Sequence, residues 1–332
     1  MHQTWQSFLN ARGIDALALS DADAPQEYCA ALVDLTVLSL RGADAASFLQ
    51  GYFTADLDDL NDARASFGAY CDIKGRVVAD LIVVANPEGL LLVTHRSLAD
   101  PIREGLKKYL MFSKSQLIDV SEDWLTLGLL GRNVTGSDLA MPAWTVERSS
   151  NLRQIAVPGG NRWLCLAGIE EAERIWSTFD GRSGASIGGS EPWRRADISA
   201  GIAHLEAATS AGFLPQMLGY DELDAISFTK GCYLGQEVVT RAQSRGQVKR
   251  RLSRWAWADQ PDHASEASEA PEAPAAGADL TNGDGRRVGT VIQSVVNSSV
   301  SGELLAVVSE AAREGSLHAG SLVLTQSSPN SG

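Results

Sequence analysis

The chain has 332 residues, of which 44% are hydrophobic and 21% charged, and its formal net charge is −13. This length allows two or three domains whose cores need no disulfide bonds. A general nucleic-acid-binding protein is disfavoured, because binding to the phosphate backbone depends on lysine and arginine contacts.

Residues 1–6 contain no basic region followed by an apolar core, and no apolar run approaches the roughly 18 residues that a membrane span needs. We therefore expect no membrane insertion and a cytoplasmic location in which thiols stay reduced. No cysteine has the spacing of a metal-ligand pair, so no stable metal site is expected. The four cysteines are Cys29, Cys71, Cys165 and Cys232.

The first part of the chain predicts an α+β unit over about 30–115. An apolar run at 37–40 leads into a helix that begins near Asp44, and apolar runs at 77–85 and 90–94 predict paired strands after a hairpin turn at 72–75. A helix closes the unit, because apolar residues follow each other at helical spacing. These residues are Leu98, Ile102, Leu106 and Leu110.

The same order recurs over about 120–243, which predicts a second, similar α+β unit packed beside the first, so that 1–243 forms one region. Here the expected strands are 125–130, 152–157 and 163–167, and the closing helix is about 169–179. Residues 181–190 are rich in Gly and Ser and predict a flexible connection.

From residue 252 the pattern changes to short strands, which predicts a small antiparallel barrel or sandwich over 244–327. The expected strands are 252–258, 288–296, 304–308 and 322–325. The insertion 259–284 consists of Ala, Pro, Glu, Ser and Gly with almost no large apolar residue, so we expect it to be disordered. Residues 327–332 are also expected to be loose.

Chemistry concentrates in the octapeptide Lys-Gly-Cys-Tyr-Leu-Gly-Gln-Glu at 230–237. The ammonium of Lys230 and the positive end of a helix beginning near Gly235 would lower the pKa of the Cys232 thiol. A lone cysteine is, however, also commonly a small buried hydrophobe. The residues alone leave a reactive and a structural role open.

Other polar residues allow two interpretations. Gln236 and Glu237 are either surface positions or ligand contacts, and Arg241 lies where an i, i+4 ion pair with Glu237 would explain both residues. His95, His204 and His318 belong to no acid–nucleophile pattern, so we expect them to be structural or exposed. Neither a dinucleotide-binding nor a P-loop glycine pattern occurs, and ATP, NAD and FAD are not expected.

The octapeptide and its flanks at 209–218 and 245–252 resemble the YgfZ family, whose signature K-G-C-Y-x-G-Q-E is present at every fixed position. The resemblance extends from about residue 30 to about residue 325. It implies a branch of the glycine-cleavage T-protein fold: two similar α+β units and a small C-terminal antiparallel β-barrel. It also implies that tetrahydrofolate or a derivative binds in a central opening.

The resemblance implies Cys232 as a reactive thiol assisted by Lys230. The remaining motif residues are Gly231, Tyr233, Gly235, Gln236 and Glu237, and the implied folate contacts are Glu206, Arg241, Asp72 and Trp193. Glu206 falls where the parent aminomethyltransferases grip the pteridine ring, although members of the YgfZ family need not keep that glutamate. A basic cluster after the motif is either a solvated face or a holder for an acidic tail such as the glutamates of a folate; it comprises Arg241, Arg245, Lys249, Arg250, Arg251 and Arg254.

The function that the resemblance implies is a monomeric accessory protein for assembly or repair of [4Fe–4S] enzymes, with iron–sulfur client or assembly proteins as partners and an indirect effect on tRNA modification. In that role folate accepts a reactive by-product, or Cys232 transiently holds iron or sulfur. The alternative is a folate-dependent aminomethyltransferase or demethylase, although those enzymes lack the Lys-Gly-Cys-Tyr element. A third is a scaffold, in which Cys232→Ser changes nothing.

Overall fold

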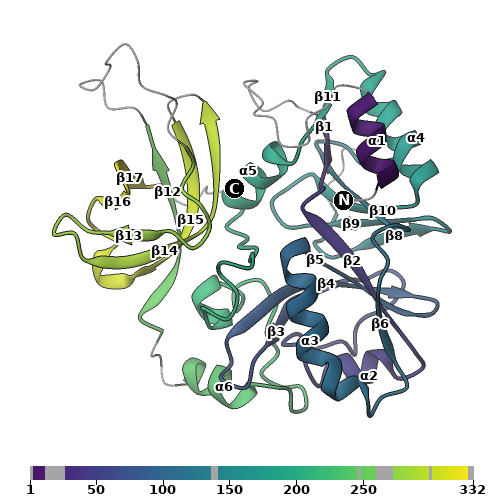
Figure 1. The fold of residues 1–332 in the computed structure, drawn as a ribbon, viewed down its shortest axis with the longest axis horizontal. Helices are drawn as coiled ribbons and strands as arrows, with labels where there is room; N and C mark the ends of the chain where they lie inside the picture. The colour runs from purple at the N-terminus through teal and green to yellow at the C-terminus, as the bar shows by residue number, and fades with distance from the viewer. Residues whose placement is uncertain are drawn as a thin grey trace.

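Two sheets stand side by side, and a closed barrel lies next to them (Figure 1). The computed structural model describes residues 3–11, 27–135, 141–244, 246, 248–258, 272–298 and 301–327. Within these residues no helix has the length and apolar character needed to cross a membrane.

The first sheet is antiparallel and has the strand order β3-β4-β5-β2-β6. Two helices accompany it, α2 and α3, and they bury Leu49, Ile102 and Leu106 in a shared core. This arrangement follows from the predicted apolar spacing, which gives each helix one apolar stripe. The elements are β2 (Leu35–Arg41), α2 (Ala45–Gln50), β3 (Ser66–Cys71), β4 (Val77–Asn86), β5 (Gly89–His95), η1 (Arg96–Leu98), α3 (Ala99–Leu110) and β6 (Gln116–Asp119).

The second sheet has the order β11-β1-β7-β10-β9-β8. Leu9 of α1 packs in one cluster with Trp176 of α4, and these helices lie beside each other in Figure 1. The elements are α1 (Gln3–Ala11), β1 (Glu27–Ala31), β7 (Leu125–Leu130), β8 (Val146–Ser149), β9 (Leu152–Ala156), β10 (Arg162–Ala167), α4 (Ile169–Asp180), β11 (Ala185–Gly188) and α5 (Glu191–Ser199).

Two features of this sheet differ from the sequence prediction. Residues 185–188, expected within a flexible connection, form β11 because they pair in parallel with β1. In addition, β1 precedes the first sheet in the chain but belongs to the second, where it also pairs antiparallel with β7. The strand β1 therefore joins the second sheet, although it stands at the start of the first predicted unit in the chain.

The C-terminal part is a closed barrel with the order β12-β15-β14-β13-β16-β17 and its own core around Trp255 and Trp257. The prediction of disorder over 259–284 is wrong for residues 272–284. These residues include β13, and the Gly277 N–H donates to the Val291 carbonyl at 2.9 Å. Residues 259–271 and 328–332 lie outside the described residues. The strands are β12 (Arg250–Trp257), β13 (Asp279–Thr281), β14 (Arg287–Ser298), β15 (Ser301–Ser309), β16 (Leu317–Ala319) and β17 (Leu322–Gln326), with η4 (Glu310–Ala312) after β15.

A largely irregular segment, 200–235, connects α5 to α6 and passes along both sheets. It contains η2 (Pro215–Leu218) and ends at α6 (Gln236–Ser244). The Ser227 N–H donates to the Thr54 carbonyl at 2.9 Å, and the Ala211 N–H donates to the Val77 carbonyl at 2.7 Å. These bonds fix the segment on the first unit, and the segment carries every candidate site residue between 204 and 235.

Candidate functional site

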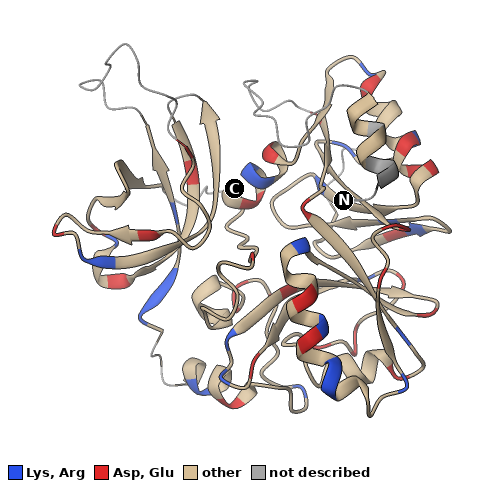
Figure 2. Ribbon diagram, in the orientation of Figure 1, with Lys and Arg blue, Asp and Glu red and all other residues tan. Residues whose placement is uncertain are grey.

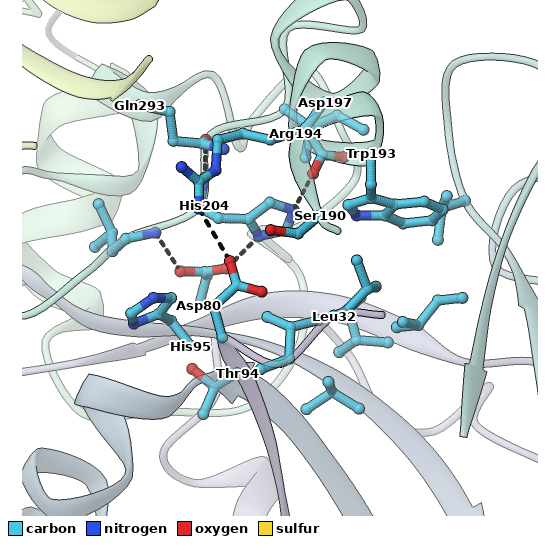
Figure 3. Close-up of a pocket in the computed structure, with 18 of the residues that line it drawn as sticks. Leu32, Asp80, Thr94, His95, Ser190, Trp193, Arg194, Asp197, His204 and Gln293 are labelled. Carbon is cyan, nitrogen blue, oxygen red and sulfur yellow. Dashed lines mark hydrogen bonds and ion pairs between the residues drawn. The ribbon is translucent and has the colours of Figure 1, made fainter. Parts of the chain in front are cut away.

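A central pocket lies where the two sheets, α5 and the barrel meet (Figure 3). The first sheet contributes Asp80 and the second contributes Leu164, while α5 supplies Trp193 and β14 supplies Gln293. The barrel is joined to the pocket by a specific contact, since the backbone N–H of His204 donates to Oε1 of Gln293 at 2.7 Å. All three parts of the fold are therefore needed to form this pocket.

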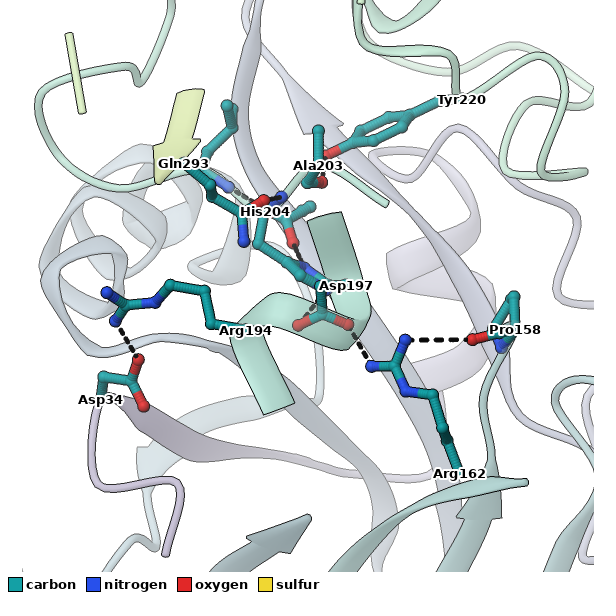
Figure 4. A network of polar contacts seen from close by, with 11 residues as sticks. Asp34, Pro158, Arg162, Arg194, Asp197, Ala203, His204, Tyr220 and Gln293 are labelled. Carbon is teal, nitrogen blue, oxygen red and sulfur yellow. Dashed lines mark hydrogen bonds and ion pairs between the residues drawn. The ribbon is translucent and has the colours of Figure 1, made fainter. Parts of the chain in front are cut away.

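A chain of charged groups runs along the pocket (Figure 4). His204 Nδ1 lies 2.6 Å from Oδ2 of Asp80, and its Nε2 lies 4.0 Å from Oδ2 of Asp197. Asp197 is in turn ion-paired with Arg162, and both side chains are almost fully buried. The order Asp80, His204, Asp197, Arg162 alternates negative and positive groups, which compensates their burial when the imidazole is protonated.

The imidazole of His204 is held in its charged form. Burial alone would lower the pKa of His204, but the carboxylates of Asp80 and Asp197 overcome this effect and raise it to about 9. With both ring nitrogens protonated, the side chain is a donor toward either carboxylate. The second oxygen of Asp80 is also occupied, because it accepts the Leu205 N–H at 2.8 Å.

Two tryptophans give the pocket flat apolar walls. The guanidinium of Arg162 stacks on Trp193 at 4.4 Å from the ring centroid. Trp144 has a φ of 68°, which is a strained backbone conformation for a bulky residue, and its ring stacks on Phe67 at 5.3 Å. Strain of this kind persists where the surrounding structure enforces it, and it concentrates at functional sites.

Glu206 lies on the wall of the same pocket. The pocket is lined by four carboxylates, and three of them have protein partners: Asp80 and Asp197 as described, and Asp34 in an ion pair with Arg194 at 3.1 Å. Within the described residues, the carboxylate of Glu206 has no hydrogen bond or ion pair. It is therefore the carboxylate in this pocket that remains available to a ligand.

The motif cysteine lies elsewhere. Cys232 is exposed and borders an open surface depression together with Tyr52, Tyr109 and Tyr233. The Tyr52 ring contacts that of Tyr109 with centroids 4.7 Å apart, so the depression has an aromatic floor. Cys232 does not line the central pocket, and the thiol and the pocket are two separate places on the molecule.

Lys230 anchors the motif to the first unit. Its ammonium donates to Gln50 Oε1 at 2.9 Å and to the carbonyls of Phe53 and Ala55 at 2.9 and 2.8 Å. These three bonds use all three N–H groups of a lysine, so none is left for the neighbouring thiol. Burial lowers the pKa of Lys230 to about 8 although nearby carboxylates oppose this shift. The role of Lys230 as activator of Cys232 stays a prediction, and its position indicates an anchor.

The motif glycine before α6 packs on the predicted hairpin. Gly235 has a φ of 84°, and a Cβ built on it would lie 2.9 Å from Cα of Gly75. Asp72 stabilises that hairpin, since its Oδ1 accepts the N–H groups of Lys74 and Arg76 at 2.8 and 2.9 Å. Asp72 is not among the residues lining the central pocket, so its predicted contact with folate has no support from its position.

The remaining motif residues lie on or before α6, which begins at Gln236 as predicted. Glu237 and Arg241 form the i, i+4 ion pair that the spacing predicts, and both side chains are largely exposed. Tyr233 is buried, and burial raises its pKa. Gly231 has open space at its Cβ position, since a Cβ there would meet nothing within 4 Å.

Sequence reasoning missed most of the central network. Asp80 carried one local signal, because it is a single carboxylate within the apolar strand β4 and is buried there. His204 and Asp197 carried none, since their meaning depends on contacts between distant segments. Among the described residues, no three His, Cys, Asp or Glu side chains are close enough together to hold a metal ion.

Comparison with known proteins matches this architecture. Residues 29–135 match the family described as "GCVT N-terminal domain". The solved structure of the glycine cleavage system aminomethyltransferase T from Bartonella henselae superposes with a TM-score of 0.74 at 14% identity, covering 98% of this chain and 96% of that one. This confirms the predicted fold.

Curated relatives are more similar in sequence. The tRNA-modifying protein YgfZ of Yersinia pestis (strain Pestoides F) is 37% identical over 229 residues, which cover 67% of this chain and 68% of the relative. The protein of the same name from Klebsiella pneumoniae (strain 342) is 34% identical over 276 residues, covering 80% of each chain. The chain belongs to the YgfZ family.

Proposed function

We propose that this protein binds tetrahydrofolate or a derivative in the central pocket and serves as an accessory factor for assembly or repair of [4Fe–4S] enzymes. Cys232 acts in this role at its own surface site. The relatives are named tRNA-modifying proteins, and we assign the effect on tRNA modification to iron–sulfur enzymes that modify tRNA.

One observation carries the folate proposal: Glu206 is the pocket carboxylate that lacks a protein partner among the described residues. A carboxylate accepts two N–H groups of a 2-aminopyrimidinone ring side by side, which is the geometry of a charge-assisted pair. Trp144 and Trp193 supply flat apolar surfaces for a bicyclic ring. The side chains present therefore match a pterin chemically, with Glu206 orienting it and the tryptophans beside it, and the cavity of about 60 Å³ must widen to admit the ring.

Asp80 and Asp197 have a different place in this proposal. Both carboxylates already accept hydrogen bonds or ion pairs from protein groups. They hold His204 protonated at the pocket wall, where it offers positive charge to a bound ligand. A transferase of the parent type needs a carboxylate near the folate nitrogen, so the engagement of these two side chains favours a binding role.

The thiol is suited to contact with another protein. Cys232 is exposed, and its surroundings are aromatic and open. Two exposed apolar side chains, Met111 and Phe112, follow Tyr109 of the same depression in the chain. A surface of this kind allows a client protein to approach the thiol closely, which a buried cysteine would not.

Tetrahydrofolate binding tests the first half of the proposal. Calorimetric titration of the native chain, Glu206→Gln and the control Glu170→Gln, an exposed carboxylate on α4, should show binding that is about tenfold or more weaker only in Glu206→Gln. Equal affinity in all three would remove Glu206 from the site. No binding to the native chain would end the folate proposal.

The second half is tested in cells that lack the protein. The activity of a [4Fe–4S] enzyme is measured after complementation with the native chain or with Cys232→Ser at matched expression. Rescue by the native chain alone ties the thiol to cluster maintenance, and equal rescue leaves Cys232 without a role. Formation of methylene-tetrahydrofolate from an aminomethyl-lipoyl carrier by the purified protein would instead establish a transferase and overturn the accessory role.

A further inference from the structure

A second cavity of about 1090 Å³ lies between the barrel and the rest of the molecule. It is bordered by α5 and η2 on one side and by the start of β12 on the other, with Leu223 and Leu305 among its apolar walls. Its volume slightly exceeds the roughly 300–1,000 Å³ that is typical of small-molecule sites. The cavity therefore has room for an extended ligand, and it shares no lining residue with the central pocket.

Four arginines border this cavity, which we call the arginine cleft: Arg195, Arg251, Arg254 and Arg313. Figure 2 shows the basic residues on α5 and along the first part of β12. In a chain with a net charge of −13, such a concentration of guanidinium groups around one cavity is a local reversal of sign. It favours an anionic ligand.

Two of these guanidinium groups form no ion pair within the described residues. Arg251 lies 3.5 Å from Asp221 and 3.6 Å from Glu222, whose carboxylate also lines the cleft, and Arg254 lies 2.9 Å from Glu303. Arg195 and Arg313 have no carboxylate within 4.0 Å among the described residues. Each instead donates one N–H to a backbone carbonyl, that of Val296 at 3.1 Å for Arg195 and that of Leu252 at 2.8 Å for Arg313.

These guanidinium groups also have unused donors. Nε of Arg195, Arg254 and Arg313 is buried and donates to no acceptor within the described part of the chain. A buried donor without an acceptor costs free energy, and the cost is larger for a charged group. Acceptor oxygens supplied by a ligand would remove that cost, and carboxylates match the planar fork of arginine.

An independent observation defines the ligand further. Gln216 is 0% exposed and lines the arginine cleft. Its Nε2 donates to the Val239 carbonyl at 2.8 Å, which fixes the orientation of the amide, while its Oε1 accepts no hydrogen bond from any described residue. This oxygen requires a donor. The cleft thus presents guanidinium donors for carboxylates and, at Gln216, a buried acceptor for an N–H group.

We propose that the arginine cleft binds an amide-linked chain of carboxylates, in which Arg195 and Arg313 pair with the carboxylates and Gln216 accepts an amide N–H. A polyphosphate satisfies the arginines but brings no N–H donor at neutral pH, so the cleft discriminates against it. The apolar walls accommodate the methylene groups between the charges.

The cleft adjoins the central pocket through α5. One face of this helix, with Trp193 and Asp197, lines the central pocket, while the other, with Arg195 and Ser199, lines the arginine cleft. The two ligand sites therefore share one wall. The assignment of the cleft rests on its own residues and not on folate binding at Glu206.

Titration calorimetry with three probes at low ionic strength tests this assignment: tri-γ-glutamate, tri-α-glutamate and tripolyphosphate. We expect a glutamyl peptide to bind the native chain more tightly than tripolyphosphate. Tighter binding of the γ-linked peptide identifies a folate tail as the source, and tighter binding of the α-linked peptide identifies an acidic segment of a protein. Tripolyphosphate binding as tight as either peptide overturns the assignment, and so does the absence of peptide binding.

Variants locate the site. Arg195→Gln and Arg313→Gln should each weaken peptide binding about tenfold or more, whereas Arg103→Gln, which removes the same charge from the exposed face of α3, should leave it unchanged. If peptide binding is weakened equally in all three variants, the peptide is attracted non-specifically by positive charge, and the proposal is overturned. Ser199→Glu adds a carboxylate to the cleft without removing an arginine contact and should also weaken binding; unchanged affinity in that variant overturns the proposal even if the arginine variants fold poorly.

One further variant separates this proposal from the proposed function. Glu206→Gln should leave the affinity for the glutamyl peptide unchanged while it lowers the affinity for tetrahydrofolate. If Glu206→Gln lost its affinity for both the peptide and tetrahydrofolate, the peptide would occupy the central pocket. The assignment of the arginine cleft would then be wrong.

Discussion

Gly235 lies directly against Asp72: a Cβ built on Gly235 would stand 2.5 Å from the carbonyl oxygen of Asp72. No real Cβ atom approaches a carbonyl oxygen so closely. The motif turn and the hairpin of the first unit thus fit together only because residue 235 has no side chain. Its positive φ of 84° adds a second reason for glycine.

Gly235→Ala should therefore lower the free energy of unfolding by about 2–4 kcal/mol, because it combines a backbone clash with an unfavourable φ. Gly231→Ala is the matched control, since a Cβ there meets nothing within 4 Å. Urea denaturation compares the two variants with the native chain. Similar stability of both variants would show that the hairpin yields without cost.

Lys230→Met should destabilise the protein by about 2–4 kcal/mol, because it leaves the oxygens of Gln50, Phe53 and Ala55 without their donor. The control is Lys74→Met, at an exposed position of the hairpin. Thermal unfolding of both variants measures the difference. If Lys230→Met keeps native stability but loses the reactivity of Cys232, the lysine serves the thiol and not the fold.

One of the four thiols should react in the native protein. Cys232 is exposed, whereas Cys29, Cys71 and Cys165 are buried, and burial raises the pKa of each of these three. Titration with a chromogenic disulfide should therefore detect one fast thiol before unfolding and all four after it. Cys232→Ser should abolish the fast phase. A remaining fast phase in that variant would show that a buried cysteine becomes accessible.

The charge of His204 predicts a pH dependence of stability. The pKa of His204 is raised from 6.5 to about 9 in the folded protein. Its contribution is therefore fully present below pH 6.5, decreases as the pH rises from there, and is lost once the pH passes about 9. The native chain should lose stability across this window by at most about 1.4 kcal/mol per pH unit more than His204→Gln. Urea midpoints at several pH values measure this, and parallel curves for both proteins would contradict the shift.

Cys232→Ser should leave tetrahydrofolate affinity unchanged, because the thiol does not line the central pocket. Calorimetric titration of the variant beside the native chain checks this, and it complements the test in cells. A large loss of affinity would place Cys232 in contact with the ligand and would join the two sites that the structure separates.

Elements with strong local patterns were predictable from the sequence. The apolar strands β4 and β7 and the helices α3 and α4 are close to their expected ranges, because each carries an apolar pattern of the right period. β11 and β13 were not, since they are short and rich in polar or small residues. Such strands form through pairing partners far away in the chain, as β11 does with β1.

The candidate site divides in the same way. The octapeptide identified the family and drew attention to Cys232 without deciding whether the thiol is exposed, and the spacing of Glu237 and Arg241 predicted their ion pair. The sequence did not reveal that Lys230 turns toward residues 50–55, nor that Asp80 meets His204. These contacts join segments that are remote in sequence, so no local pattern encodes them.

The position of β1 has a consequence for synthesis on the ribosome. Tyr28 in this strand pairs with Leu130 on one side and Ser186 on the other, so β1 is made before the whole first sheet and has no partner until β7 and β11 follow. The first sheet needs only residues 35–119 and can form from shorter-range pairings. Until residue 130 has been translated, β1 has no partner beside the nearly finished first sheet, and its second edge stays open until residue 188. The nascent chain is therefore most prone to aggregate in the middle of its translation, and a chaperone that shields β1 would act there.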